Sequence, residues 1–180
     1  GFCFAVKASR FLTHRKKLRD PENALDNLLP RVAELEEKLG PILFQLPPRW
    51  QANPERLDAL LTLLPRKLLY AFEFRDPSWH TPGIYAILRR HNAAFCAFDL
   101  AGFESPVEIT ADFTYIRLHG PGGKYQGSYS HSALSDWAER IRGWRRQLRS
   151  VFVYFDNDQA GYAAHNALTL KQLVGERASH

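Results

Sequence analysis

Methionine is absent from the 180-residue sequence, and cysteine occurs only as Cys3 and Cys96. Because Gly1 stands within an apolar, strand-like run and no start methionine precedes it, we expect a fragment or a processed chain that lacks N-terminal residues. Both cysteines lie in apolar runs, which favours buried thiols in a reducing, cytoplasmic compartment over a disulfide or a nucleophile. No basic lead-in typical of a signal peptide precedes the first strand-like run.

Long apolar runs are also missing. No segment approaches the roughly 20 residues that cross a bilayer, so we expect no membrane partner. Hydrophobic residues make up 45% of the chain and charged residues 24%, ordinary values that argue against disorder. The net charge of +5 permits anionic partners such as phosphates or nucleic acid but is too small to require them.

Strand-like and helix-like segments alternate, which predicts an α/β fold with a parallel sheet covered by helices. The predicted strands are residues 2–8, 42–46, 69–75, 93–99, 113–119 and 151–156. The predicted helices are residues 21–39, 54–64, 82–91, 132–149 and 159–174. Asp20, Asn53 and Thr81 each precede a proline, a pairing typical of a helix N-cap. Gly40, followed by proline, is expected to end the first helix.

Polar or charged residues stand at the end of every predicted strand. They are Lys7, Gln45, Glu73, Arg75, Asp99, Arg117, His119, Asp156 and Asp158. No glycine-rich nucleotide-binding turn follows an early strand, so an open, doubly wound sheet is disfavoured. In a barrel, by contrast, all strand ends meet at one mouth. We therefore expect one domain over residues 1–180, a TIM-like (β/α)8 barrel that lacks about two βα units.

Side chains two residues apart on a strand share a face, so Glu73 should point with Arg75, and Arg117 with His119. One interpretation is a functional pocket, since barrel sites lie at strand ends. The alternative is an ion network that only neutralises itself, because buried charges need partners.

Five motifs, in order along the chain, resemble the YecE-like family, also known as domain of unknown function 72. They are FAVKASRFLTH (4–14), LGPILFQLPP (39–48), FEFRDPSW (72–79), YIRLHG (115–120) and YFDNDQAGYAAHNA (154–167). The resemblance implies a (β/α) barrel and an absent N-terminal segment, but no activity, since the family has none firmly established. The positions that match the family's motifs are Lys7, His14, Gln45, Glu73, Arg75, Trp79, Arg117, His119, Gly120, Asp156, Asn157, Asp158 and Asn166.

Catalysis is predicted to rest on His119 as a general acid or base, with Glu73 or Asp156 as its acidic partner. The residues predicted to bind substrate are Lys7, Gln45, Arg75, Trp79, Asp99, Arg117, Gly120, Tyr125, Asn157 and Asp158. Among them, the cations suit a phosphate or carboxylate, which the glycine-rich loop 120–124 could also hold through backbone N–H groups. The aromatic rings, together with that of Tyr129, suit stacking on a base or sugar.

Less specific interpretations accompany several of these residues. Loop 120–124 could be a simple mobile turn, Asp158 a helix cap, and Trp79 a lid over the barrel edge. A basic stripe on the helix 132–149 is expected to be a solvated face rather than a nucleic-acid site. Glu73, Asp99, His119 and Asp156 could hold a divalent metal, but nearby cations can neutralise the same carboxylates, so no cofactor is assigned.

Three functions fit these residues; the first is preferred, and the third ranks above the second. The first is an enzyme or binding protein for a small phosphorylated or otherwise anionic polar ligand. The second is a nucleic-acid-binding or endonuclease-like protein, and the third a non-catalytic ligand-binding or scaffold protein. We further expect that the chain alone self-associates through open sheet edges.

Overall fold

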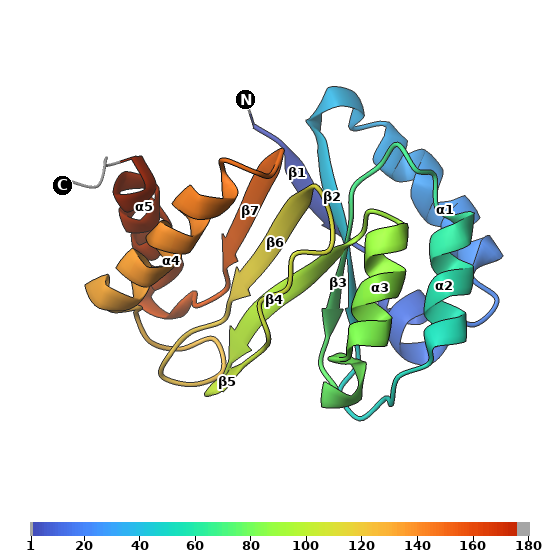
Figure 1. Ribbon diagram of the computed structural model, residues 1–180, viewed down its shortest axis with the longest axis horizontal. Coiled ribbons are helices and arrows are strands. Elements are labelled where there is room, and N and C mark those ends of the chain that lie inside the picture. The colour runs from blue at the N-terminus through green and yellow to red at the C-terminus, as the bar shows by residue number, and fades with distance from the viewer. Residues whose placement is uncertain (1, 176–180) are drawn as a thin grey trace. The chain divides into compact units, whose positions relative to one another are not determined.

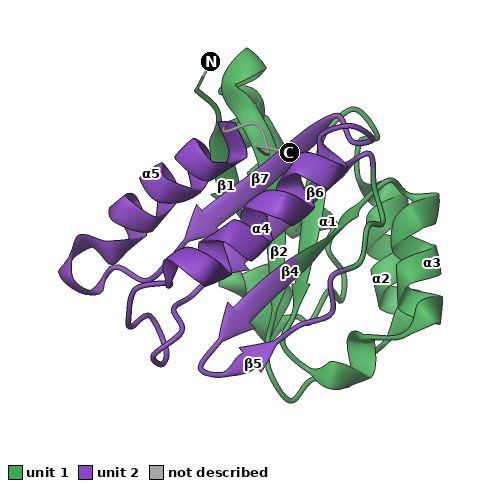
Figure 2. Cartoon of the chain, turned by 60° about the vertical axis from the view of Figure 1, so that its left-hand side comes forward, with its two compact units in different colours: residues 1–96, 108–111 green, residues 97–107, 112–180 purple. Residues whose placement is uncertain are grey.

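The computed structural model describes residues 2–175, which form two compact units (Figure 2). Unit 1 comprises Gly1–Cys96 and Glu108–Ala111, and unit 2 comprises Ala97–Val107 and Asp112–His180. Strand β4 (Ala94–Leu100) contributes its first residues to unit 1 and its last residues to unit 2.

Unit 1 is a parallel sheet covered by helices (Figure 1). Its strands are β1 (Phe4–Lys7), β2 (Leu39–Leu46), β3 (Tyr70–Phe74) and the start of β4, paired in that order. Its helices are α1 (Glu22–Ala33), α2 (Pro54–Leu63) and α3 (Pro82–Arg90). A π-helical turn, η1 (Phe11–Arg15), and two 3-10 turns, η2 (Glu36–Lys38) and η3 (Pro77–Trp79), lie in the connections.

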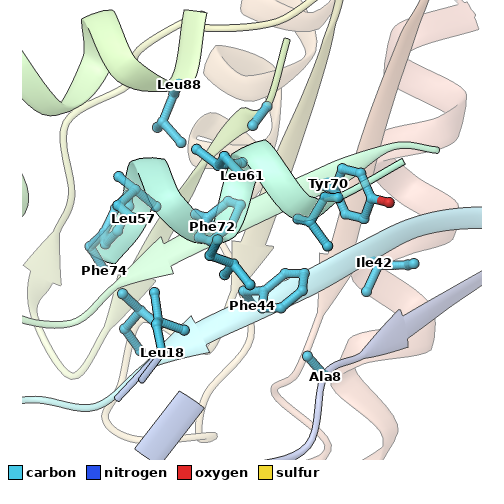
Figure 3. Packing of buried hydrophobic residues seen from close by; sticks show 14 of the residues in the cluster. Ala8, Leu18, Ile42, Phe44, Leu57, Leu61, Tyr70, Phe72, Phe74 and Leu88 are labelled. Atoms are coloured by element: carbon cyan, nitrogen blue, oxygen red, sulfur yellow. The ribbon is translucent and has the colours of Figure 1, made fainter. Parts of the chain in front are cut away.

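The core of unit 1 lies between the sheet and its helices (Figure 3). Phe44 of β2 and Phe72 of β3 stack with ring centroids 5.0 Å apart, because parallel pairing brings them into register. Leu57 and Leu61, four residues apart on α2, belong to the same buried cluster. The even-numbered residues of β2 and β3 therefore face the helices, and Gln45 and Glu73 face the other side of the sheet.

Unit 2 contains the end of β4 with β5 (Phe103–Glu104) antiparallel to it, and the parallel pair β6 (Phe113–Leu118) and β7 (Ser150–Phe155). Helices α4 (His131–Trp144) and α5 (Tyr162–Gly175), the latter preceded by the 3-10 turn η4 (Gln159–Gly161), complete it. Ala97, Ile116 and Leu118 pack with Leu134 and Ile141 of α4 in one buried cluster.

The six predicted strands and their parallel order are confirmed, with ends that differ by a few residues. Two predicted caps are also confirmed. The side chain of Asn53 accepts the backbone N–H of Arg56 at 2.9 Å, and that of Thr81 accepts the N–H of Ile84 at 3.4 Å.

The first predicted helix is wrong at both ends. Asp20 is no N-cap, because its φ of +43° lies in the left-handed region, and α1 starts without a side-chain cap. The helix ends at Ala33. Gly40 lies inside β2 and does not end the helix. A Cβ on Gly40 would stand 2.9 Å from the carbonyl oxygen of Phe4, so the close approach of β1 and β2 explains this glycine.

Three further expectations are corrected. Cys3 is exposed, and only Cys96 is a buried thiol. The antiparallel strand β5, two residues long, was not predicted, because so short a segment carries no periodicity. Helix α4 ends at Trp144 rather than at Arg149.

The fold class is therefore α/β with a mainly parallel sheet, and residues 2–175 do not form a closed barrel of eight strands. Within residues 2–175, no helix combines the length and apolar character that crossing a membrane requires.

Candidate functional site

A group of polar side chains, Arg117, His119 and Asp156, lies at the carboxyl ends of β6 and β7 in unit 2. Asp156 Oδ2 lies 2.8 Å from Arg117 Nη2 and 3.3 Å from His119 Nδ1, within ion-pair distance of both side chains. The side chain of His119 is fully buried, and those of Arg117 and Asp156 are 13% and 30% exposed. Arg117 and His119 thus reach one carboxylate from the same face of the chain, as strand alternation predicts.

Two aromatic rings stand edge-on to the His119 imidazole. Tyr125 lies 5.5 Å away between ring centroids and Phe98 lies 6.4 Å away. Tyr125 is 43% exposed, and its φ of +64° shows that its loop holds it in the left-handed region. A carboxylate at Nδ1 with an enclosed ring is the arrangement that fixes the orientation of an acid–base histidine.

Asp99 lies on the opposite face of the sheet from this group. Ala97, two residues earlier on β4, packs with Ile116 and Leu118 beneath α4, and Asp99 follows it on that face. Its carboxylate accepts the Tyr129 hydroxyl at 2.5 Å and the backbone N–H of His119 at 2.8 Å. The sequence suggested that Asp99 lies beside Arg117. The structure instead places Asp99 behind His119, on the other face of the sheet.

Burial changes the acidity of both members of this pair. Desolvation raises the pKa of Asp99, although hydrogen bonds from Tyr129 and from the His119 backbone oppose the shift. Desolvation, followed by the hydrogen bond to Asp99, raises the pKa of Tyr129 far above its ordinary value. Asp99 also lines a pocket of about 160 Å³ together with Glu104 and Asp136.

The glycine-rich loop after β6 is a tightly bonded turn. Gly120 has a φ of +111°, and a Cβ there would lie 2.2 Å from the carbonyl oxygen of Gln126. The N–H of Gly120 donates to the Tyr129 hydroxyl at 2.9 Å, and that of Gly122 to the Gln126 carbonyl at 3.2 Å. The N–H of Gly127 donates to the Gln159 side chain at 3.3 Å. These donors serve the loop itself, which weakens the expectation that they hold a phosphate.

The motif after β7 fastens this loop. Asn157 Nδ2 donates to the Gly127 carbonyl at 2.8 Å and to Asn166 Oδ1 at 2.9 Å. Asn166 Nδ2 in turn donates to Ser128 Oγ at 3.0 Å. Asn157 is fully buried, and its Oδ1 has no hydrogen-bond partner among the residues that the structure describes. Asp158 is exposed and its side chain caps no helix, so that interpretation is wrong.

In unit 1, the predicted carboxylate and cation form a pair. Arg75 Nε donates to the fully buried Glu73 carboxylate, and Cys96 Sγ approaches the other carboxylate oxygen at 3.9 Å. Gln45 is the register partner of Glu73 on β2. This arrangement satisfies Glu73 with Arg75 and fits the ion-network interpretation there.

A second feature of unit 1 is an excess of positive charge near β1. Burial is the largest cause that lowers the pKa of His14, and the charges of Arg10, Lys7 and Arg75 lower it further. Lys7 is exposed at the end of β1, and η1 carries His14. Arg10 was absent from the predicted site, although it falls within the first family motif between Lys7 and His14.

Trp79 does not line an open site. It is fully buried, its Nε1 donates to the Trp50 carbonyl at 2.7 Å, and its ring stacks on Phe74 at 4.9 Å. Tyr129 is buried as well, so neither ring is exposed for stacking on a base or sugar. Tyr129 was considered in the sequence only as a stacking ring, since no local pattern reveals a hydroxyl that bonds a carboxylate thirty positions away.

No cluster of metal ligands is formed by residues 2–175. Among them, no three His, Cys, Asp or Glu side chains come close enough together to hold an ion. The set Glu73, Asp99, His119 and Asp156, weighed from the sequence, is accordingly not assembled into a metal centre.

Comparisons with known proteins give one consistent result. A family model described as "Protein of unknown function DUF72" matches residues 1–180. The chain is similar to the UPF0759 protein YunF of Bacillus subtilis (strain 168), with 24% identity over 206 residues that cover 96% of this chain and 73% of that protein.

Solved structures agree with this result. A crystal structure of a DUF72 family protein from Thermotoga maritima MSB8 is 28% identical with a TM-score of 0.86, and the match covers 97% of this chain and 74% of that one. A DUF72 family protein from Enterococcus faecalis V583 is 18% identical with a TM-score of 0.75, over 99% of this chain and 76% of that one. The latter likeness concerns the fold alone.

Proposed function

Because this chain belongs to the DUF72 family of proteins of unknown function, as its motifs suggested, we propose a function from its own side chains. We propose that it is an enzyme that catalyses proton transfer to or from a small anionic polar substrate. His119 is the general acid or base, Asp156 orients it, and Arg117 holds the Asp156 carboxylate.

The geometry around Asp156 carries this proposal. The fully buried imidazole has its Nδ1 3.3 Å from a carboxylate oxygen, and a carboxylate at that position favours a proton on Nδ1. Nε2 is then the nitrogen that exchanges a proton with a substrate. Arg117, at 2.8 Å from the same oxygen, holds the Asp156 carboxylate in place.

Unit 1, considered by itself, carries a group of cations that supports an anionic ligand. Burial lowers the pKa of His14, and the charges of Arg10, Lys7 and Arg75 lower it further; the Arg75 guanidinium also pairs with the Glu73 carboxylate. Such an excess of cations favours an anion, and guanidinium groups bind phosphate and carboxylate in a bidentate manner.

For the architecture, we propose that the strands belong to one (β/α)8 barrel domain with ligands at the carboxyl ends of its strands. The TM-score of 0.86 to the Thermotoga maritima structure and the parallel order of the strands support this assignment.

A metabolite screen tests the proposed function. Wild-type protein is incubated with phosphorylated and carboxylated metabolites, and binding is followed by thermal shift and conversion by mass spectrometry. We expect at least one substrate, whose turnover falls by about 100-fold or more in His119→Gln, since general acid–base catalysis contributes that much. Asp156→Asn should reduce turnover in the same direction.

The matched control is His165→Gln. His165 is an exposed histidine of α5, so its loss should leave turnover unchanged. Equal turnover by His119→Gln and wild type would remove His119 from catalysis, and a panel without any ligand would remove the anionic substrate.

A further inference from the structure

The backbone that carries His119 is held from behind by two buried side chains, Asp99 and Tyr129. We infer that these two are positioning residues that set the His119 imidazole for proton transfer from the opposite face of the sheet. The inference rests on the proposed function of His119 and replaces the ligand-binding role that the sequence suggested for Asp99.

Two consecutive amides enter this arrangement. The N–H of His119 donates to Asp99 Oδ1 at 2.8 Å, and the N–H of Gly120 donates to the Tyr129 hydroxyl at 2.9 Å. The same hydroxyl donates to the Asp99 carboxylate at 2.5 Å. Asp99, Tyr129 and the His119–Gly120 peptide therefore form a closed ring of hydrogen bonds, which we call the amide clamp.

The hydrogen-bonding capacity of the clamp is largely used by the clamp itself. A tyrosine hydroxyl has one proton, which goes to Asp99, and it accepts the N–H of Gly120. The carboxylate of Asp99 accepts both the hydroxyl and the N–H of His119. Such charge-assisted bonds are stronger than neutral ones, which suits them to fixing a backbone rather than exchanging ligands.

Tyr129 is itself fixed in position. Its N–H donates to Asn166 Oδ1 at 3.1 Å, and its ring meets Phe155 edge-on with centroids 5.7 Å apart. Asn157 donates to the same Asn166 oxygen, so the motif after β7 supports the clamp. The clamp thus connects β4 with the loop after β6, and Asn166 of α5 supports it from within unit 2.

The clamp acts where a small backbone movement would change the site. His119 is the first residue after β6, and Gly120, with its φ of +111°, is the point at which the chain turns away. Loss of either clamp bond would let the turn shift and move Nδ1 from its position 3.3 Å from Asp156. A displacement of that kind weakens catalysis without removing any group that touches substrate.

Nuclear magnetic resonance of the whole 180-residue chain tests the clamp. In Tyr129→Phe, we expect the Gly120 amide to exchange with solvent about tenfold faster, as loss of one hydrogen bond would allow. We also expect the imidazole nitrogen resonances of His119, and their pH titration, to move away from the wild-type values. Tyr162→Phe, which removes a hydroxyl on α5 outside the clamp, should leave both unchanged.

Asp99→Asn is the second variant, because it removes the charge without changing the shape, and it should shift the same His119 resonances. The inference is overturned if the imidazole resonances of folded Tyr129→Phe and Asp99→Asn coincide with wild type. It is also overturned if neither variant folds, since the pair would then build unit 2 rather than position a histidine. This readout needs no substrate, so a failed metabolite screen would refute the proposed function while leaving the clamp measurable.

Discussion

Asp156 receives two basic side chains from the neighbouring strand end because Arg117 and His119 are two residues apart. The pleat of β6 directs both toward β7, where Arg117 is in register with Tyr154, two positions before Asp156. This part of the site could be predicted from the sequence, since it depends only on strand alternation and on the parallel order of β6 and β7.

Asp99 shows what the same pattern could not reveal. It ends a strand like the others, but its face is set by Ala97 and by the helix that covers it, and both depend on tertiary packing. Tyr129 lies thirty positions away along the chain, and only the folded loop brings its hydroxyl to the carboxylate. The residues behind His119 therefore could not be inferred from local spacing.

Gly120 offers a prediction at this scale. Gly120→Ala should lower the free energy of unfolding by at least about 2 kcal/mol, because φ is +111° and the new Cβ would lie 2.2 Å from the Gln126 carbonyl oxygen. Urea unfolding followed by circular dichroism measures the change. The matched control is Gly143→Ala in α4, where a Cβ meets nothing within 4 Å, and it should stabilise the protein by roughly 0.5 kcal/mol. Similar effects at both glycines would contradict the special geometry of the loop.

At the level of elements, local chemistry predicted most helices and strands. Asn53 and Thr81 start helices because each side chain accepts an N–H three residues ahead, which is a local interaction. Asp20 precedes a proline in the same way but adopts a left-handed φ. Gly40 looked like a helix stop, but it lies inside β2. A glycine stands there because the Phe4 carbonyl oxygen of β1 is 2.9 Å from where a Cβ would be. Long-range packing thus decided the cases that local signals left ambiguous.

Helices α2 and α3 are joined by an ion pair whose effect depends on pH. Asp58 Oδ1 lies 2.6 Å from Arg90 Nη2 and 2.7 Å from His91 Nε2. The bond from Arg90, then that from His91, lowers the pKa of Asp58 below its ordinary value. A lowered folded-state pKa gives stability that is present above the ordinary pKa of aspartate and is lost as pH falls through the folded value.

Asp58→Asn should therefore lower the free energy of unfolding at pH 7 by about 0.5 kcal/mol, a small effect because the side chain is 38% exposed and solvent screens the pair. Urea titrations at pH 7 and at acidic pH measure it, and the difference should shrink as the pH falls through the lowered folded-state pKa of Asp58. Asp26→Asn on α1 is the control, since Asp26 is exposed and forms no ion pair among the described residues. A deficit of equal size at both pH values would show that the ion pair is not its cause.

The whole chain consists of two compact units that share β4, and this division was not predicted. The alternation of strands and helices indicates a parallel sheet. It does not indicate which residues pack together into one compact unit and which into another. The connection from β4 to β6 has no helix, and its residues 108–111 return to unit 1. There, the Thr110 hydroxyl donates to the Ala93 carbonyl and accepts the N–H of Phe95, both at 2.7 Å.

Sheet edges give the prediction that belongs to the molecule as a whole. Within the described residues, β1 pairs only with β2, and β7 pairs only with β6, so each presents unused backbone groups along one side. Phe2 and Phe4 beside or within β1 are 73% and 44% exposed. Exposed apolar edge strands pair with other chains, so we expect the 180-residue chain to self-associate, with an apparent mass that rises with concentration in sedimentation velocity.

Phe4→Lys should reduce this association, because a charge on an edge strand disfavours pairing with a second copy. Leu168→Lys is the matched control, since Leu168 is 65% exposed but lies on α5, outside any sheet edge. If general hydrophobic attraction drove association, both variants would reduce it alike, and the edge would lose its role. A chain that stays monomeric at every concentration and melts cooperatively would show instead that the open edges are protected in solution.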